Sequence, residues 1–185
     1  MSTTRSNTVK MKHRYLNLNN LEDLIDGVVV RPLKIHRDAS GILVETLRID
    51  WDDVYKSING DFAMQYMSKT PAGLARDEDE WHVHQKQKDR FICISGKIVT
   101  AVYDPRDDSK TNGKLNLFSM GPGTDEEMYI VVIPEETYHG FMVISQEDGM
   151  LLNFPTQLYN GEDEGRVKHA GEFDWQDVRN DFGIK

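Results

Sequence analysis

Short apolar segments separated by turn residues run through most of this chain. Residues 62–68 and 97–103 are rich in β-favouring side chains, and the apolar segment 127–133 ends at Pro134. Glycine, proline and asparagine separate roughly ten such segments, a spacing that is typical of β-sandwiches and barrels. Helical signals are confined to residues 21–26, residues 50–60 and the acidic tail, where Phe173, Trp175, Val178 and Phe182 could dock a terminal helix. The sequence therefore predicts an all-β barrel or sandwich with a few short peripheral helices.

Two of the turn signals predict β-hairpins. Ser95 and Gly96 separate residues 90–94 from residues 97–103, and a polar turn separates residues 140–145 from residues 149–154. Short loops that contain glycine commonly join antiparallel neighbours. We therefore expect each of these two pairs to lie side by side in one sheet.

The length of 185 residues predicts one domain over residues 14–185, behind a flexible tail at residues 1–13. No apolar run approaches the roughly 18–20 residues that cross a membrane, and the N-terminus lacks the apolar core of a signal peptide. Cys93 is the single cysteine, so no disulfide can form within the chain. It lies in an apolar segment, which favours a buried thiol in a reducing compartment. We expect a cytoplasmic protein without a membrane partner.

The formal net charge of −9 argues against binding to nucleic acid, because such proteins usually carry a basic face. The acidic residues gather in three runs, 77–80, 125–127 and 162–164, which we expect to be solvated loops. The basic residues near the histidines described next remain available for a small anionic partner.

Two histidines occupy alternate positions just before a buried segment. His82 and His84 share one face of a strand, about 6.5–7 Å apart along the chain. Asp89 and Arg90 are adjacent, so only one of them can face the same side, and Asp89 does so only if residues 85–88 turn or bulge. If the shared face lines the interior of a sandwich, the imidazoles point into a cavity.

Two kinds of chemistry fit these residues. A histidine near its ordinary pKa of about 6.5 is a natural proton carrier, and a neighbouring carboxylate makes it a better base. His82, His84, Asp89 and His139 could equally be ligands of a divalent metal such as Zn, Fe, Mn or Ni. The residue types alone leave both alternatives open.

Four motifs, in order, resemble the dTDP-4-dehydrorhamnose 3,5-epimerase family, whose members are cupins that work without a metal. The spacing His82-x-His84-x4-Asp89-x6-Gly96 is also similar to the first cupin motif, and Pro134-x4-His139 to the second. The resembling segments cover roughly residues 40–165 and are Trp81 to His84 with Gln87, Asp89, Arg90 and Phe91; Gly96 to Arg106 with Ser109, Thr111 and Gly113; Ile133, Pro134 and His139 to Phe141; and Asn153 to Thr156 with Tyr159.

This resemblance implies a cupin jelly-roll, a double-stranded β-helix, usually found as a homodimer. It implies a nucleotide-linked 4-keto-6-deoxy hexose as the substrate and no cofactor. In the family a histidine removes a proton beside the keto group, and reprotonation on the other face inverts that carbon. The family's base corresponds to His84 in this chain.

Several other family residues are replaced. The lysine that stabilises the enolate corresponds to Asp89, and the tyrosine acid corresponds to Asn153. The nearest candidate for the arginine that holds the sugar nucleotide is Arg76, and the carboxylate that pairs with the base has no clear match. Loss of the lysine removes positive charge that can be worth several kcal/mol in the transition state.

We therefore expect a divergent epimerase or isomerase of nucleotide sugars. The expected catalytic residues are His84 and Tyr159, and the expected substrate-binding residues are Arg76, Gln87, Arg90, His139 and Asn153. Asp104 and Arg106 are expected to stabilise their own turn rather than to bind substrate. The alternatives are a metal-dependent cupin enzyme that uses His82, His84, Asp89 and His139, and a non-catalytic nucleotide-sugar binding protein.

Overall fold

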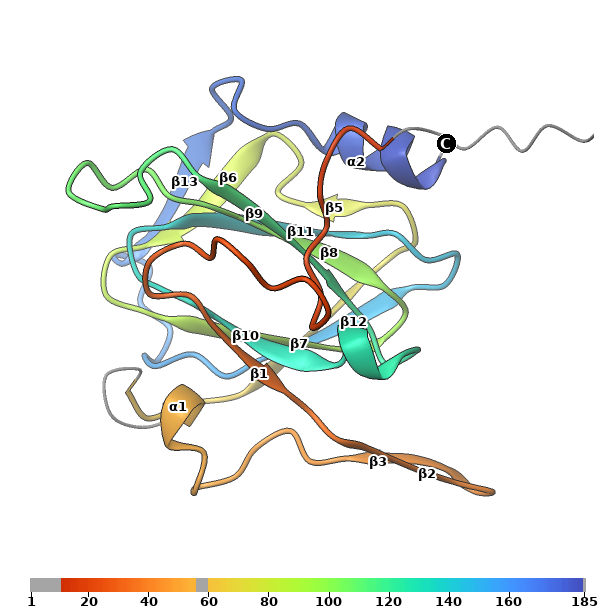
Figure 1. Ribbon diagram of the computed structural model, residues 1–185. Coiled ribbons are helices and arrows are strands. Elements are labelled where there is room, and N and C mark those ends of the chain that lie inside the picture. The colour runs from red at the N-terminus through yellow and green to blue at the C-terminus, as the bar shows by residue number, and fades with distance from the viewer. Residues whose placement is uncertain (1–10, 56–59, 185) are drawn as a thin grey trace, which may run out of the picture.

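Two antiparallel β-sheets face each other in the computed structural model, which describes residues 11–55 and 60–184 (Figure 1). The first sheet has the order β1 (Val29–Pro32), β10 (Tyr129–Ile133), β7 (Asp89–Ser95), β12 (Gly149–Asn153) and β4 (Tyr66–Thr70). The second has the order β13 (Glu164–Lys168), β6 (Glu80–His84), β11 (Tyr138–Val143), β8 (Ile98–Tyr103) and β9 (Leu115–Met120), with β5 (Ala75–Arg76) also paired to β11. This arrangement is the cupin jelly-roll that the sequence predicted.

Both predicted hairpins are wrong, because the chain changes sheets at each turn. β7 belongs to the first sheet and β8 to the second, while β11 belongs to the second and β12 to the first. Gly96 makes the β7–β8 corner with a φ of +69°, and an added Cβ would lie 2.8 Å from Ser145 Oγ. Only glycine suits such a crowded left-handed position. The short turn is therefore a corner between sheets rather than a hairpin loop.

The long turn between β8 and β9 is built around a buried carboxylate. Asp104 accepts hydrogen bonds from Arg106 Nε at 2.8 Å, Ser109 Oγ at 2.6 Å and Thr111 Oγ1 at 2.6 Å. Burial opposes ionisation of Asp104, but these donors outweigh it and hold the pKa of Asp104 below its usual range. The prediction that Asp104 and Arg106 stabilise their own turn is confirmed.

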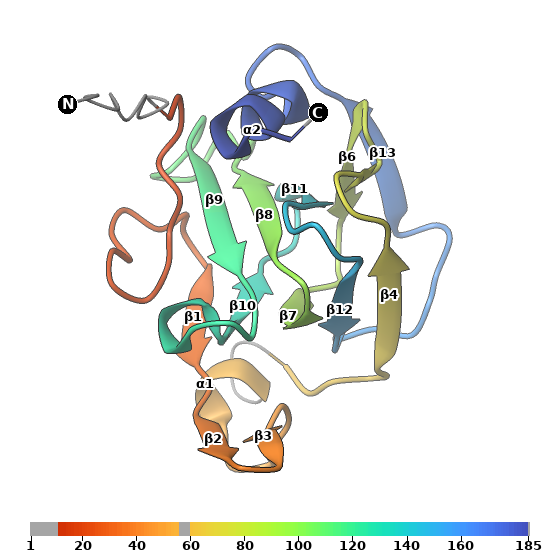
Figure 2. The same ribbon diagram turned by 90° about the vertical axis from the view of Figure 1, so that its right-hand side faces the viewer.

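Side chains of opposite character alternate along β6. Trp81 is completely buried on the outer face of the second sheet, where the centroid of its ring lies 5.2 Å from that of Phe173. The helix α2 (Trp175–Phe182) closes this outer cluster, begins at the capping residue Asp174 and ends at Gly183. Since neighbouring residues of a strand face opposite ways, anchoring Trp81 outward turns His82 and His84 inward. Figure 2 shows α2 at the upper ends of β8 and β9, and the expected terminal helix is confirmed.

A second cluster covers the outer face of the first sheet. The short helix α1 (Asp52–Tyr55) packs there against Ile92 and Phe154, and the hairpin of β2 (Ile35–Asp38) and β3 (Gly41–Val44) projects beyond it (Figures 1 and 2). The predicted helical turn over residues 50–60 is thus present in its first part, while residues 56–59 lie outside the described residues.

Residues 21–26 form no helix, contrary to expectation. The backbone N–H of Ile25 donates to Asn116 Oδ1, and that of Asp26 donates to Thr111 Oγ1, both at 2.9 Å. These side chains satisfy donors that a helix would have used internally. Ile25 itself is buried in the core between the sheets.

The first described residues of the chain contact the terminal helix. Residues 1–10 lie outside the described residues, but the backbone N–H groups of Lys12 and His13 donate to the Asp181 carboxylate of α2. The end of the expected tail is therefore attached to α2. Cys93 is buried and unpaired, as expected, and no helix in the described ranges 11–55 and 60–184 could cross a membrane.

Candidate functional site

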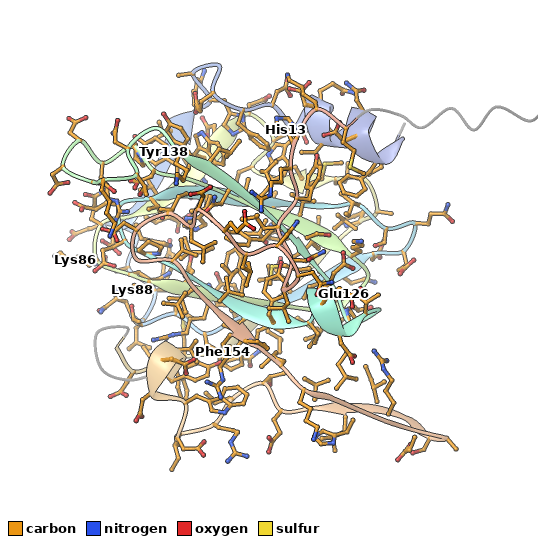
Figure 3. All side chains as sticks on the ribbon, in the orientation of Figure 1. His13, Lys86, Lys88, Glu126, Tyr138 and Phe154 are labelled. Carbon is orange, nitrogen blue, oxygen red and sulfur yellow. The ribbon has the colours of Figure 1, made fainter. Side chains whose placement is uncertain are left out.

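A cavity of about 310 Å³ opens at one end of the sandwich, between the two sheets. The turn from β6 to β7 borders this end, and Figure 3 labels its residues Lys86 and Lys88. Five of the seven predicted catalytic or substrate-binding residues line the cavity: Arg76, His84, Gln87, His139 and Tyr159. Asp89 lines it as well, because the turn over residues 85–88 carries the chain to the facing sheet.

His84 is a buried imidazole with a carboxylate close to its Nδ1 atom, which has no hydrogen-bond partner within the described residues. Gln87 Nε2 donates to Asp89 Oδ1 at 2.8 Å and lies 3.0 Å from His84 Nε2. Because an amide nitrogen only donates, His84 Nε2 is the acceptor, and the ring proton belongs on Nδ1. The Nδ1 atom lies 3.6 Å from Asp163 Oδ2. Burial lowers the pKa of His84, against the opposing effect of Asp89.

Asp163 is a residue of the site that the sequence did not identify. It lies in the acidic run 162–164, which was expected to be a solvated loop, but its side chain is only 8% exposed. The backbone N–H groups of Gln85 and Gln87 donate to its two oxygens at 3.2 Å. The expectation of a fully solvated run is therefore wrong at Asp163, which supplies the carboxylate beside His84.

His82 and Arg166 continue this chain of contacts toward the cavity mouth. His82 Nε2 lies 2.8 Å from His84 Nε2, and Arg166 donates to His82 Nδ1 from strand β13. Burial, together with the neighbouring His139, His84 and Arg166 side chains, lowers the pKa of His82 to about 3, so His82 is neutral. Its Nε2 lies against the same His84 nitrogen that Gln87 contacts.

A buried carboxylate lies on the facing sheet. Asp89 is 2% exposed and accepts hydrogen bonds at Oδ1 from Gln87 and Asn153, each at 2.8 Å. His139 Nε2 lies 3.0 Å from Asp89 Oδ2, while its Nδ1 lies 3.3 Å from the Thr137 carbonyl oxygen. Asp89 Oδ2 can only accept when the carboxylate is ionised, so His139 Nε2 is the donor in this contact. Burial opposes ionisation of Asp89, but hydrogen bonding and the charge of His139 still hold its pKa below the usual range.

Three of these side chains could also hold a metal ion. One ligand atom each from His82, Asp89 and His139 lies within 4.8 Å of the others. Two imidazoles and one carboxylate are suitable ligands for several divalent transition metals. His84, the fourth residue of the expected metal set, is not part of this group among the described residues.

Arg90 does not reach the cavity, contrary to its predicted role in substrate binding. Its side chain is completely buried on the other face of the first sheet, where it donates to the carbonyl oxygens of Val54, Gly60 and Phe154. Figure 3 labels Phe154 on that side, toward α1. Of the adjacent pair, Asp89 faces the cavity and Arg90 faces away, as the alternation along a strand requires.

The other predicted residues differ in depth. Asn153 is completely buried behind Asp89, and Arg76 reaches the cavity from β5. Tyr159 lies at the rim and is 75% exposed. A different tyrosine, Tyr66 of β4, lines the cavity wall beside Asn153 and was not identified from the sequence.

Comparison with known proteins places this site in context. The family model described as dTDP-4-dehydrorhamnose 3,5-epimerase matches residues 22–180. The chain is 40% identical over 140 residues to the probable low-salt glycan biosynthesis epimerase Agl13 of Haloferax volcanii, covering 75% of this chain and 83% of that protein. It is 30% identical over 157 residues to the spore coat polysaccharide biosynthesis protein SpsL of Bacillus subtilis, covering 82% of this chain and 97% of that protein.

A solved structure shares the fold at lower identity. The dTDP sugar isomerase of Desulfovibrio desulfuricans superimposes with a TM-score of 0.72 at 20% identity, covering 82% of this chain and 92% of that one. At this identity the likeness concerns the jelly-roll alone.

Proposed function

Because the chain belongs to the dTDP-4-dehydrorhamnose 3,5-epimerase family, we propose that its cavity binds a nucleotide-activated 4-keto-6-deoxy hexose and inverts a carbon beside the keto group. The chain is an epimerase, an isomerase of carbohydrates. The pairing of His84 with Asp163 carries this proposal, since a neutral imidazole with a carboxylate behind it can remove a proton from carbon.

In the proposed reaction, the bound sugar replaces the contacts of His84 Nε2 with Gln87 and His82, and Nε2 takes a proton from carbon 3 or carbon 5 of the sugar. The electron pair of the broken C–H bond forms a C=C bond, and the carbonyl π electrons move to the oxygen. Asp163 stabilises the imidazolium that forms on His84. Preorganised charge of this kind is usually the largest contribution to stabilising a transition state in which charge develops. No organic cofactor is required, because the keto group already acidifies both carbons.

Two arginines at the cavity are suited to the diphosphate of the nucleotide. Arg76 and Arg166 both line the cavity, and guanidinium groups bind phosphate oxygens in pairs. Tyr159 at the exposed rim is placed to contact the substrate outside the reacting sugar. We propose these residues, with Gln87, as the substrate-binding set.

The direct test is exchange with solvent deuterium. Incubation of the protein with dTDP-4-keto-6-deoxyglucose in D2O is expected to place deuterium at carbon 3 or carbon 5 of the sugar, observed by NMR. The reason is that the proton taken by His84 exchanges with solvent before the carbon is reprotonated. Heat-inactivated protein controls for spontaneous exchange of the ketone. An active-protein rate no higher than that control would refute the proposed function.

A metal-dependent reaction is the second candidate, and the convergence of His82, Asp89 and His139 favours it. A divalent ion held there would supply positive charge opposite the keto oxygen. The expected result is near-stoichiometric Zn, Fe, Mn or Ni in protein purified without chelators, measured by elemental analysis and lost in the His139→Ala variant. Full deuterium exchange by protein dialysed against a chelator and free of metal would exclude this candidate.

We further propose that the protein is a cytoplasmic homodimer that serves polysaccharide biosynthesis. The β2–β3 hairpin projects from the sandwich (Figure 1) and exposes Ile42 and Leu43 at 51% and 62%. Ile49, just after it, is 80% exposed. Apolar side chains gathered on a projecting element are typical of an interface. Sedimentation equilibrium at twice the monomer mass is the expected observation.

A further inference from the structure

Tyr66 presents a hydroxyl group to the cavity from the edge of the first sheet. It begins strand β4, where its backbone pairs directly with Asn153 of β12. The Tyr66 hydroxyl oxygen lies 2.8 Å from Asn153 Nδ2, and the side chain lines the cavity. A buried amide thus fixes the position of this phenol at the wall of the site.

The hydrogen bonds of Asn153 determine the direction of the phenol proton. Asn153 Oδ1 accepts from the backbone N–H of Arg90 at 2.9 Å, so the amide nitrogen must face the cavity side. Its two protons go to Asp89 Oδ1 and to the Tyr66 oxygen. The Tyr66 oxygen is therefore an acceptor in this contact, and its own proton remains available for a group in the cavity.

Tyr66 and His84 lie on opposite walls. Tyr66 belongs to the first sheet and His84 to the second, and the cavity lies between them. Inversion at a carbon needs a base on one face of the sugar and a proton donor on the other. A single histidine that removes and returns the proton on one face would give exchange without inversion.

We propose that Tyr66 is the catalytic acid, which delivers a proton to the face of the sugar opposite His84. This inference rests on the proposed function. In the step, the Tyr66 O–H bond breaks and its electron pair stays on the phenolate. The proton forms the new C–H bond with the electron pair of the enolate C=C, and the C=O bond is restored. Solvent then returns a proton to Tyr66 and removes one from His84, so no other reactant is consumed.

The surroundings of Tyr66 agree with this role. Burial, together with the charge of Asp89, raises the pKa of Tyr66 to about 12, so the phenol carries its proton at neutral pH. Donation by Asn153 stabilises the phenolate that forms during the step. Tyr159, the tyrosine expected from the sequence, is 75% exposed at the rim, and within residues 11–55 and 60–184 its hydroxyl has no contact like that between Tyr66 and Asn153.

The test compares Tyr66→Phe with Tyr159→Phe by following exchange and inversion in the same D2O reaction. Deuterium exchange measures proton removal by His84. The configuration of the recovered sugar measures proton delivery by the acid. For Tyr66→Phe we expect the ratio of inversion to exchange to fall at least about 100-fold, the usual contribution of a positioned acid. Tyr159→Phe is expected to slow exchange and inversion together, because Tyr159 belongs to the proposed substrate-binding set, and to change their ratio less than threefold. Persisting exchange shows that the Tyr66→Phe site is folded.

Three results would contradict the proposal, and each contradicts a different part of it. A ratio that falls less than tenfold in Tyr66→Phe would overturn the assignment of the acid while leaving the proposed function in place. A large fall in Tyr159→Phe instead would transfer the role to Tyr159. Absence of both exchange and inversion in the unmodified protein would refute the proposed function itself, and with it the role of Tyr66.

Discussion

Replacing His84 with glutamine is expected to lower the rate of deuterium exchange into the sugar by about 10³-fold. General-base catalysis by a positioned histidine contributes about 10²–10⁴-fold, and glutamine has no basic nitrogen to replace it. The glutamine amide can still meet Gln87 and Asp163 in the cavity wall, so the fold is expected to persist. The rate is measured by NMR with saturating substrate.

A matched control is available outside the cavity. His13 lies against α2, where its ring contacts Asp181, and Figure 3 labels it far from the turn at Lys86. His13→Gln makes the same chemical change and is expected to keep the exchange rate within about twofold. Retention of more than a tenth of the exchange rate by His84→Gln would contradict the assignment of the base.

Asp163→Asn separates the contribution of the carboxylate to the exchange rate from that of the His84 base. The asparagine keeps one acceptor for the backbone of the turn but removes the charge beside His84 Nδ1. We expect an exchange rate between those of the unmodified protein and His84→Gln, because the base remains while its imidazolium loses a stabilising partner. A loss equal to that of His84→Gln would mean that the carboxylate positions the ring as well as stabilising its charge.

Alternation along one strand carried most of what the sequence could predict about the site. Burial of Trp81 on the outer face turns His82 and His84 inward, and this pattern is visible in four consecutive residues. The same rule places Asp89 and Arg90 on opposite faces of the first sheet. Turn residues were less informative, because Ser95 and Gly96 signal that the chain changes direction but not that it enters the other sheet.

Asp163 and Tyr66 were missed for a common reason. Each meets its partner through contacts between distant segments: Asp163 lies 79 residues from His84, just before β13 pairs with β6, and Tyr66 lies 87 residues from Asn153. Neither stands in a motif with the residue it contacts. An acidic run and a tyrosine at the start of an edge strand are ordinary surface features until strand pairing is known.

The same pairing explains how the site differs from the family pattern. Asn153, which the sequence comparison expected to replace the family's tyrosine, pairs directly with Tyr66 of the neighbouring strand. Asp89, which it expected to replace the family's lysine, lies 3.0 Å from His139 on the facing sheet. A comparison position by position reveals neither of these neighbours.

Removal of the Asp89 carboxylate is expected to have the largest effect on stability. In Asp89→Ala the side chains of Gln87, Asn153 and His139 lose a buried acceptor. Each buried donor left without a partner costs about 1–3 kcal/mol, so together they are expected to cost roughly 3–5 kcal/mol. We expect a decrease of that size in the free energy of unfolding, measured by urea denaturation.

Asp89→Asn is the control that separates the hydrogen bonds from the charge. The asparagine oxygen can still accept from Gln87 and Asn153, and its amide can donate to His139 Nε2 if that histidine becomes neutral and keeps its proton on Nδ1, toward Thr137. The expected loss of stability is therefore only about 1–2 kcal/mol. Epimerisation, by contrast, should fall in both variants, because neither retains the carboxylate charge that lies beside His139 and that would hold a metal ion. Equal losses of stability in the two variants would mean that the charge of Asp89, rather than its hydrogen bonds, holds the two sheets together at the cavity.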